Sequence, residues 1–127
     1  MQIRQQVIEA NTTGGSNVGL GRFALTTNTT GSDNTAVGNY SLNSSTTASH
    51  NTAVGNSALN LNTTGAQNVA VGRNAMLDNT TGSYNVAVGQ AALANNTTAN
   101  SNIAIGNDSL YANTTGTKNV VVGTNAL

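Results

Sequence analysis

The sequence contains no cysteine and no proline. Without cysteine, the chain can form neither a disulfide framework nor a thiolate metal site. Charge is also scarce, because charged residues make up 6% of the chain, with four basic and four acidic side chains. Four basic side chains are too few to bind the phosphate backbone of a nucleic acid or an anionic membrane surface.

Long apolar runs are absent and aromatic side chains are rare. The longest apolar runs have three or four residues, as in Val120 to Val122, whereas a transmembrane helix needs about 20. Met1 to Ala10 lacks the apolar stretch of a secretory signal, so we expect no membrane insertion. The aromatic residues are Phe23, Tyr40, Tyr84 and Tyr111. A lone globule normally buries more large side chains, so the core is predicted to be thin and repetitive, or shared between chains.

Three residue types recur at a fixed spacing along almost the whole chain. Asparagine recurs every 17 residues, at Asn17, Asn34, Asn51, Asn68, Asn85, Asn102 and Asn119. Glycine follows four residues later each time, at Gly21, Gly38, Gly55, Gly72, Gly89, Gly106 and Gly123. Leucine or methionine follows four residues after that, at Leu25, Leu42, Leu59, Met76, Leu93, Leu110 and Leu127. A fixed period without insertions indicates stacked repeat units, and rows of like groups favour a structural protein over an enzyme.

Positions within each repeat, or coil, are counted from this asparagine as position 1. Position 2 is Thr, Val or Ile, position 3 is mostly Ala, and position 4 is always aliphatic. This pattern predicts a short strand with positions 2 and 4 on one face and position 3 on the other. Small apolar residues on the second face predict a strand that is covered on both sides. The glycine at position 5 indicates positive φ or a close approach of two backbones.

The rest of the coil predicts a second core segment and a corner. Position 8 is Ala or Ser and position 9 is Leu or Met, which supplies one large core side chain per coil. Positions 12 to 15 read Asn-Thr-Thr-Gly, with departures at Ser45, Ala48 and Ala99, and this composition marks a corner. The density of Gly, Asn and Thr argues against helices.

We therefore predict an all-β fold, a parallel β-solenoid of about seven 17-residue coils with two or three short strands in each. The repeat solenoid is expected over residues 11–127. Met1 to Ala10 falls in register, with Ile3 at position 4 and Ile8 at position 9. This segment is predicted to be a degenerate first coil or an N-terminal junction. One Val, one Leu and a few alanines per coil make a thin core, so burial between chains is expected to add stability.

Candidate chemistry is sparse. His50 is the single histidine and occupies position 17, a variable position where we expect a solvated side chain. The acidic residues Glu9, Asp33, Asp78 and Asp108 fall at different coil positions and form no row of metal ligands. We find no nucleophile beside a base and no phosphate-binding loop. The chain is therefore predicted to have no catalytic residue, no metal site and no cofactor.

Three surface features remain open to more than one interpretation. The asparagine rows at positions 1 and 12 are interpreted as hydrogen-bonded ladders, with glycan binding as the alternative. The threonine rows at positions 13 and 14 raise the alternative of an ice-binding face, and we treat the match of Asn-Thr-Thr to the glycosylation sequon as coincidence. The variable positions carry most of the charge and aromatic side chains. Candidate surface-binding residues there are Tyr40, Arg73, Tyr84 and Tyr111.

The repeat unit resembles those of two groups of fibrous proteins. The units Asn68 to Gly72 (Asn-Val-Ala-Val-Gly) and Asn102 to Gly106 (Asn-Ile-Ala-Ile-Gly) resemble the head repeats of trimeric autotransporter adhesins, which are shorter. The fuller unit, Asn-Thr-Ala-Val-Gly-x-x-Ala-Leu-x-x-Asn-Thr-Thr-Gly, is more similar to repeats in bacteriophage tail fibres. The similarity covers Asn11 to Leu127. It implies parallel β-rolls that pack as a homotrimer.

These observations lead us to expect a structural segment of a phage tail fibre or surface adhesin. It would supply reach and stiffness and contact a host-surface glycan through its variable positions. The expected partners are two further copies of the chain, a host glycan, and other fibre or tail proteins at the chain ends. The expected location is a virion tail fibre or the outside of a cell. The alternatives are a monomeric ice-binding solenoid and a self-assembling extracellular filament subunit.

Overall fold

The computed structural model describes residues 10–127. The degenerate first coil expected at Met1 to Ala10 lies outside this part, apart from Ala10. The described residues contain seven strands of three residues each and no helix. The strands are β1 (Val18–Leu20), β2 (Thr35–Val37), β3 (Thr52–Val54), β4 (Val69–Val71), β5 (Val86–Val88), β6 (Ile103–Ile105) and β7 (Val120–Val122).

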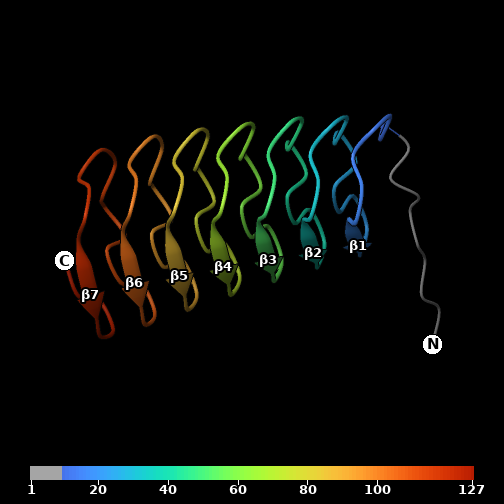
Figure 1. Cartoon of the computed structure of the whole chain (residues 1–127). Helices are drawn as coiled ribbons and strands as arrows, with labels where there is room; N and C mark the ends of the chain where they lie inside the picture. The colour runs from blue at the N-terminus through green and yellow to red at the C-terminus, as the bar shows by residue number, and fades with distance from the viewer. Residues whose placement is uncertain (1–9) are drawn as a thin grey trace.

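The strands form one parallel sheet in chain order, from β1 to β7. Figure 1 shows a row of narrow coils, with the strands side by side along one edge and longer loops extending from them. The register between neighbours advances by one whole repeat, so Val69 pairs with Val86 and Ala70 pairs with Ala87. Seven strands joined by six complete turns confirm the predicted all-β parallel solenoid.

Each coil contains one strand, and the expectation of two or three strands per coil was wrong. The rest of the coil turns through residues with positive φ at positions 7, 9 and 17, such as Tyr40 (φ 58), Leu42 (φ 47) and His50 (φ 60). Their backbone N–H groups still donate to neighbouring coils, as Tyr40 does to the Arg22 carbonyl at 2.9 Å and Leu42 does to the Ala58 carbonyl at 3.0 Å. The chain therefore bonds from coil to coil without extended backbone.

The strands expose the large side chains and bury the small ones. In β4, Ala70 is fully buried, whereas Val69 and Val71 are each 36% exposed. Positions 2 and 4 do share one face, as predicted, but that face points outward. Our expectation that the strand is covered on both sides, with an aliphatic position 4 in the core, was therefore wrong within the single chain.

The core is a column of one large side chain per coil surrounded by alanines. Its large members occupy position 9, as predicted, and are Leu25, Leu42, Leu59, Met76, Leu93 and Leu110. Alanines at positions 3 and 8, such as Ala70 and Ala75, pack against this column and are fully buried. Because the position 9 side chains already fill the interior, the strand can direct only a methyl group inward, and its valines must face out.

Candidate functional site

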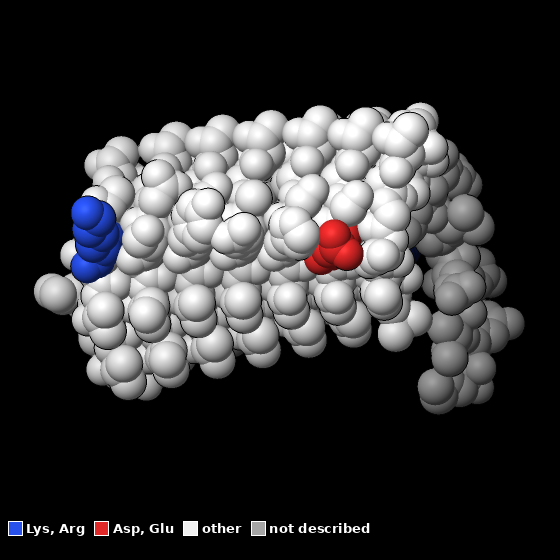
Figure 2. All heavy atoms as spheres, in the orientation of Figure 1, with Lys and Arg blue, Asp and Glu red and all other residues white. Residues whose placement is uncertain are grey.

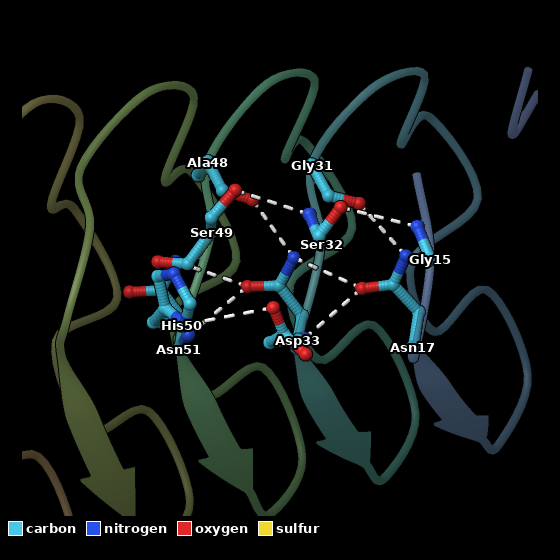
Figure 3. A network of polar contacts seen from close by, with 10 residues as sticks. Gly15, Asn17, Gly31, Ser32, Asp33, Ala48, Ser49, His50 and Asn51 are labelled. Carbon is cyan, nitrogen blue, oxygen red and sulfur yellow. Dashed lines mark hydrogen bonds and ion pairs between the residues drawn. The ribbon is translucent and has the colours of Figure 1, made fainter. Parts of the chain in front are cut away.

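The asparagine at position 1 closes its own coil and binds the next one. Asn34 is fully buried, and its Nδ2 donates to the Ala48 carbonyl in the same coil at 2.8 Å. Its Oδ1 accepts from the backbone N–H of Asn51 at 3.0 Å and from the Asn51 Nδ2 at 3.2 Å. Figure 3 shows this ladder running from Asn17 towards Asn51. The repeated asparagine therefore satisfies buried backbone groups in two coils at once.

A second ladder of asparagines runs at position 12. Asn79 Nδ2 donates to the Gly82 carbonyl at 3.0 Å and to Asn62 Oδ1 at 2.7 Å. The same Gly82 carbonyl also accepts from Asn68 Nδ2, a position 1 asparagine, at 2.8 Å. The two ladders thus converge on the carbonyl of position 15 wherever position 12 is asparagine, which fixes the corner. These side chains have a structural role, and Asn62 and Asn79 are fully buried, which removes them as glycosylation sites in the folded chain.

Ser45 interrupts the position 12 ladder. In the described part of the chain, Ser45 Oγ and Asn28 Oδ1 are buried side-chain atoms without a hydrogen-bond partner. Other coils show the missing contact: Asn79 donates to Asn62 Oδ1 across the same step. A serine is too short to reach the oxygen of the preceding asparagine. One sequence departure therefore leaves two buried polar atoms unsatisfied.

Ser45→Asn is expected to stabilise the fold by about 1 to 3 kcal/mol, because it supplies the missing donor to Asn28 Oδ1 and removes an unpaired hydroxyl. Position 12 accepts asparagine in a coil that also carries alanine at position 15, as Asn96 and Ala99 show. Urea unfolding followed by circular dichroism measures the effect. Ser44→Asn, one residue earlier and partly exposed, is the control and should leave the midpoint unchanged. An unaltered midpoint for Ser45→Asn would contradict the ladder argument.

The threonine rows differ from each other in what their hydroxyls do. At position 13, Thr63 Oγ1 donates to the Thr80 carbonyl at 3.0 Å, and Thr80 Oγ1 donates to the Thr97 carbonyl at 3.0 Å. At position 14, Thr64 and Thr81 are exposed. One row therefore ties neighbouring coils together, and a single row faces outward.

The four candidate surface-binding residues occupy four different columns of the solenoid. Tyr40 lies at position 7, Arg73 at position 6, Tyr84 at position 17 and Tyr111 at position 10, and all four are exposed. Tyr40 and Tyr111 are separated by four coils, or about 19 Å along the axis. The structure does not bring these four residues together into one site.

An aromatic cluster that we did not anticipate includes one of them. The rings of Tyr40 and Phe23 stack with centroids 4.9 Å apart and an interplanar angle of 27°. The Arg22 guanidinium lies 4.6 Å from the centroid of the Phe23 ring. The signal was present in the sequence, because Phe23 and Tyr40 are 17 residues apart and therefore fall in the same column of adjacent coils.

Charged groups are few and lie at the surface. His50 Nδ1 is 3.7 Å from Asp33 Oδ2, and both side chains are more than half exposed, so the pair contributes little stability. Figure 2 shows a face almost free of charge, with basic atoms near the C-terminal end and acidic atoms towards the other end. Residues 10–127 contain no group of three His, Asp or Glu side chains that could hold a metal ion. No helix in this part is long and apolar enough to cross a membrane.

The outward side chains of β1 to β7 form a continuous apolar surface, which we call the strand face. It consists of positions 2 and 4 of every coil. Its exposed members are Val18, Leu20, Val54, Val69, Val71, Ile103, Ile105, Val120 and Val122. Between them lie the partly exposed Thr35, Val37, Thr52, Val86 and Val88. A contiguous apolar surface of this kind is typical of an interaction site.

No family model, curated protein or solved structure matches the chain.

Proposed function

We infer that this chain is a structural segment of a trimeric fibre, such as a phage tail fibre or a surface adhesin, that holds an attachment point away from the particle or cell that bears it. The observation that carries this proposal is the strand face. It aligns two columns of aliphatic and threonine side chains along the whole described solenoid. A lone chain would leave these columns in water, whereas association removes them from water.

The strand face favours copies of the same chain as its occupants. Residues of similar shape, valine, isoleucine or threonine, stack in register along β2 to β6, so a second copy presents the same spacing from coil to coil. The face carries no charge, so close packing leaves no charged group unpaired. Closed symmetric assembly is the usual outcome for identical chains, and the resemblance of the repeat to trimeric adhesin heads and tail fibres favours three chains.

Rigidity follows from the way in which the coils are joined. Backbone bonds, the position 1 asparagine ladder and the position 13 threonines connect neighbouring coils, and the position 12 ladder adds further bonds except at Ser45. At roughly 4.8 Å per coil, six turns give a rod of about 29 Å. Such a rod gives reach without catalysis. In this proposal other fibre or tail proteins join at the chain ends, the location is a virion or cell surface, and a host glycan is contacted from the outer columns.

Val71→Lys is expected to convert the trimer to single chains, because it places a charge in the middle of the strand face that three packed chains would have to bury. Light scattering coupled to size exclusion gives the mass, and circular dichroism reports the fold. Gln90→Lys is the matched control, since it adds the same charge at position 6, where Arg22 and Arg73 already stand. It should keep the mass of three chains.

Two outcomes would count against the trimer. One is a single-chain mass for the unaltered protein together with strong β circular dichroism, and the other is a three-chain mass for Val71→Lys. If that variant does not fold, Val86→Thr provides a milder test. Threonine already stands at position 2 in Thr35 and Thr52, so this change should preserve the coil while weakening association.

The ice-binding alternative has one observation in its favour, the outward row of threonines at position 14. The position 13 hydroxyls, however, donate to backbone carbonyls of the next coil, so a single row remains to order water. If the protein proves to be monomeric, thermal hysteresis of a frozen solution is the measurement that decides this alternative.

A further inference from the structure

A groove runs along the outer surface of the last four coils, on columns other than those of the strand face. Its volume is about 550 Å³, and its lining residues share positions 7 and 9 to 11 of the coil. They are Asn74, Leu77, Ala91, Ala94, Asn95, Asp108, Tyr111, Ala112, Asn125 and Leu127. This volume lies within the range of about 300 to 1,000 Å³ that is common for small-molecule sites.

The groove exists because two columns carry alanine in the same coil. Ala91 and Ala94 are 8% and 3% exposed and form its floor. At position 10, the column reads Leu77, Ala94, Tyr111, so a large side chain stands on each side of the gap. These two side chains belong to coils two steps apart, which is roughly 10 Å. Ala94 therefore leaves a slot about one coil wide, roughly 4.8 Å, between them.

At the other end of the solenoid, the same columns are filled. Phe23 and Tyr40 occupy position 7 in adjacent coils, and their rings stack on each other. Asn43 occupies position 10, and its Nδ2 donates to the Phe23 carbonyl at 3.0 Å and to Thr26 Oγ1 at 2.6 Å. The coil geometry alone therefore does not create the groove. The small side chains of Ala91 and Ala94 leave these columns unfilled.

The lining combines apolar walls with groups that hydrogen-bond to hydroxyls. The ring of Tyr111 and the side chain of Leu77 offer apolar surfaces against which the C–H face of a sugar can pack. Asn74 and Asn95 provide amides that donate and accept, and Asp108 provides a carboxylate that accepts from hydroxyls. Asn107 Nδ2 donates to Asp108 Oδ2 at 2.7 Å, which helps to orient the carboxylate.

The charge of the groove favours neutral sugars over acidic ones. Asp108 is the one charged residue in its lining, so an acidic sugar would bring a second negative charge to a site without a basic partner. A neutral sugar meets no such repulsion. We propose that this groove binds a neutral hexose or N-acetylhexosamine unit of a surface glycan, with Tyr111 and Leu77 as walls and Asp108 and the flanking asparagines as hydroxyl partners. The inference rests on the proposed attachment role and not on the number of chains in the fibre.

Saturation-transfer NMR on the full chain tests the groove with a defined set of probes. The neutral probes are the methyl glycosides of glucose, galactose, mannose and N-acetylglucosamine, and the acidic probe is methyl glucuronide, which differs from methyl glucoside by one carboxylate. We expect at least one neutral probe to bind and methyl glucuronide not to bind. Binding of no neutral probe, or equal binding of methyl glucuronide and methyl glucoside, would overturn the proposal.

A pair of variants locates the binding site. Ala94→Leu fills the groove with a side chain that the neighbouring coil already carries at position 10, as Leu77. It should weaken binding of the neutral probe by about tenfold or more. Asn60→Leu makes the same kind of change in the same column outside the groove and should leave binding unchanged. If Ala94→Leu and Asn60→Leu bind the neutral probe equally well, and both keep the circular dichroism of the unaltered chain, the assignment of the binding site to the groove is overturned.

The oligomeric mass of the same samples separates this proposal from the trimer. A protein with the mass of three chains that binds no neutral probe overturns the groove alone. The opposite result is a protein with the mass of one chain that binds a neutral probe and loses this binding in Ala94→Leu. It would support the groove and overturn the trimer.

Discussion

Gly72→Ala is expected to destabilise the fold by about 2 to 5 kcal/mol. Gly72 has a φ of 133°, which side-chain-bearing residues rarely adopt. A Cβ at this position would lie 2.5 Å from the Gly89 carbonyl oxygen and 2.6 Å from its carbon, both in the backbone of the next coil. Neither atom can move aside without opening the stack. The midpoint and slope of urea unfolding, followed by circular dichroism, measure the loss.

The control for this prediction is another glycine-to-alanine change in the same solenoid. An added Cβ at Gly15 meets no atom within 4 Å, and its φ lies outside the positive range. Gly15→Ala should therefore leave stability unchanged or raise it slightly, because alanine restricts the unfolded chain. A similar loss of stability in Gly72→Ala and Gly15→Ala would show that backbone contact is not the reason for glycine at position 5. All seven position 5 glycines have φ between 128° and 142°. A Cβ would meet the carbonyl oxygen of the next position 5 glycine at all of them except Gly123, so the result extends to the other five.

The period predicted the parallel solenoid, because a repeat without insertions places like residues in register in every coil. It also predicted position 9 as the core column, as Leu59 and Met76 show. It did not reveal which face of the strand points inward. Alternation separates Val69 and Val71 from Ala70, but either face could be the buried one. The outcome depends on the volume inside the coil, where a leucine column leaves space for methyl groups alone.

The number of strands in each coil could not be predicted from the sequence either. Leucine and tyrosine rarely adopt positive φ, yet Leu42 and Tyr40 do so here, because contacts between coils outweigh local preference. The groove is different, since its cause is visible in the residues. Ala91 and Ala94 interrupt two columns that carry larger side chains elsewhere. The groove is therefore encoded in the variable columns and not in the constant ones.

Asn68→Ala is the second change with a large expected effect, a loss of roughly 3 to 5 kcal/mol. Asn68 is fully buried, and its Nδ2 donates to the Gly82 carbonyl at 2.8 Å. Its Oδ1 accepts from the backbone N–H of Asn85 at 3.0 Å. Truncation leaves that buried N–H without its partner and opens a cavity beside it. Thermal and urea unfolding of the variant against the unaltered chain provide the measurement.

Two further variants distinguish hydrogen bonding from the loss of volume. Asn68→Asp preserves the size and an acceptor for the Asn85 N–H, but at neutral pH it faces the Gly82 carbonyl with a carboxylate in place of an amide donor. It should be destabilised about as much as Asn68→Ala, since a buried charge without a donor partner is costly. Asn56→Ala removes an exposed asparagine and should have little effect. A stable Asn68→Asp would mean that the side-chain volume and the acceptor for the Asn85 N–H are sufficient, and that the donor bond to the Gly82 carbonyl adds little. If instead both changes at Asn68 are severe, the asparagine that recurs every 17 residues is retained because it bonds to its own coil and the next with one side chain.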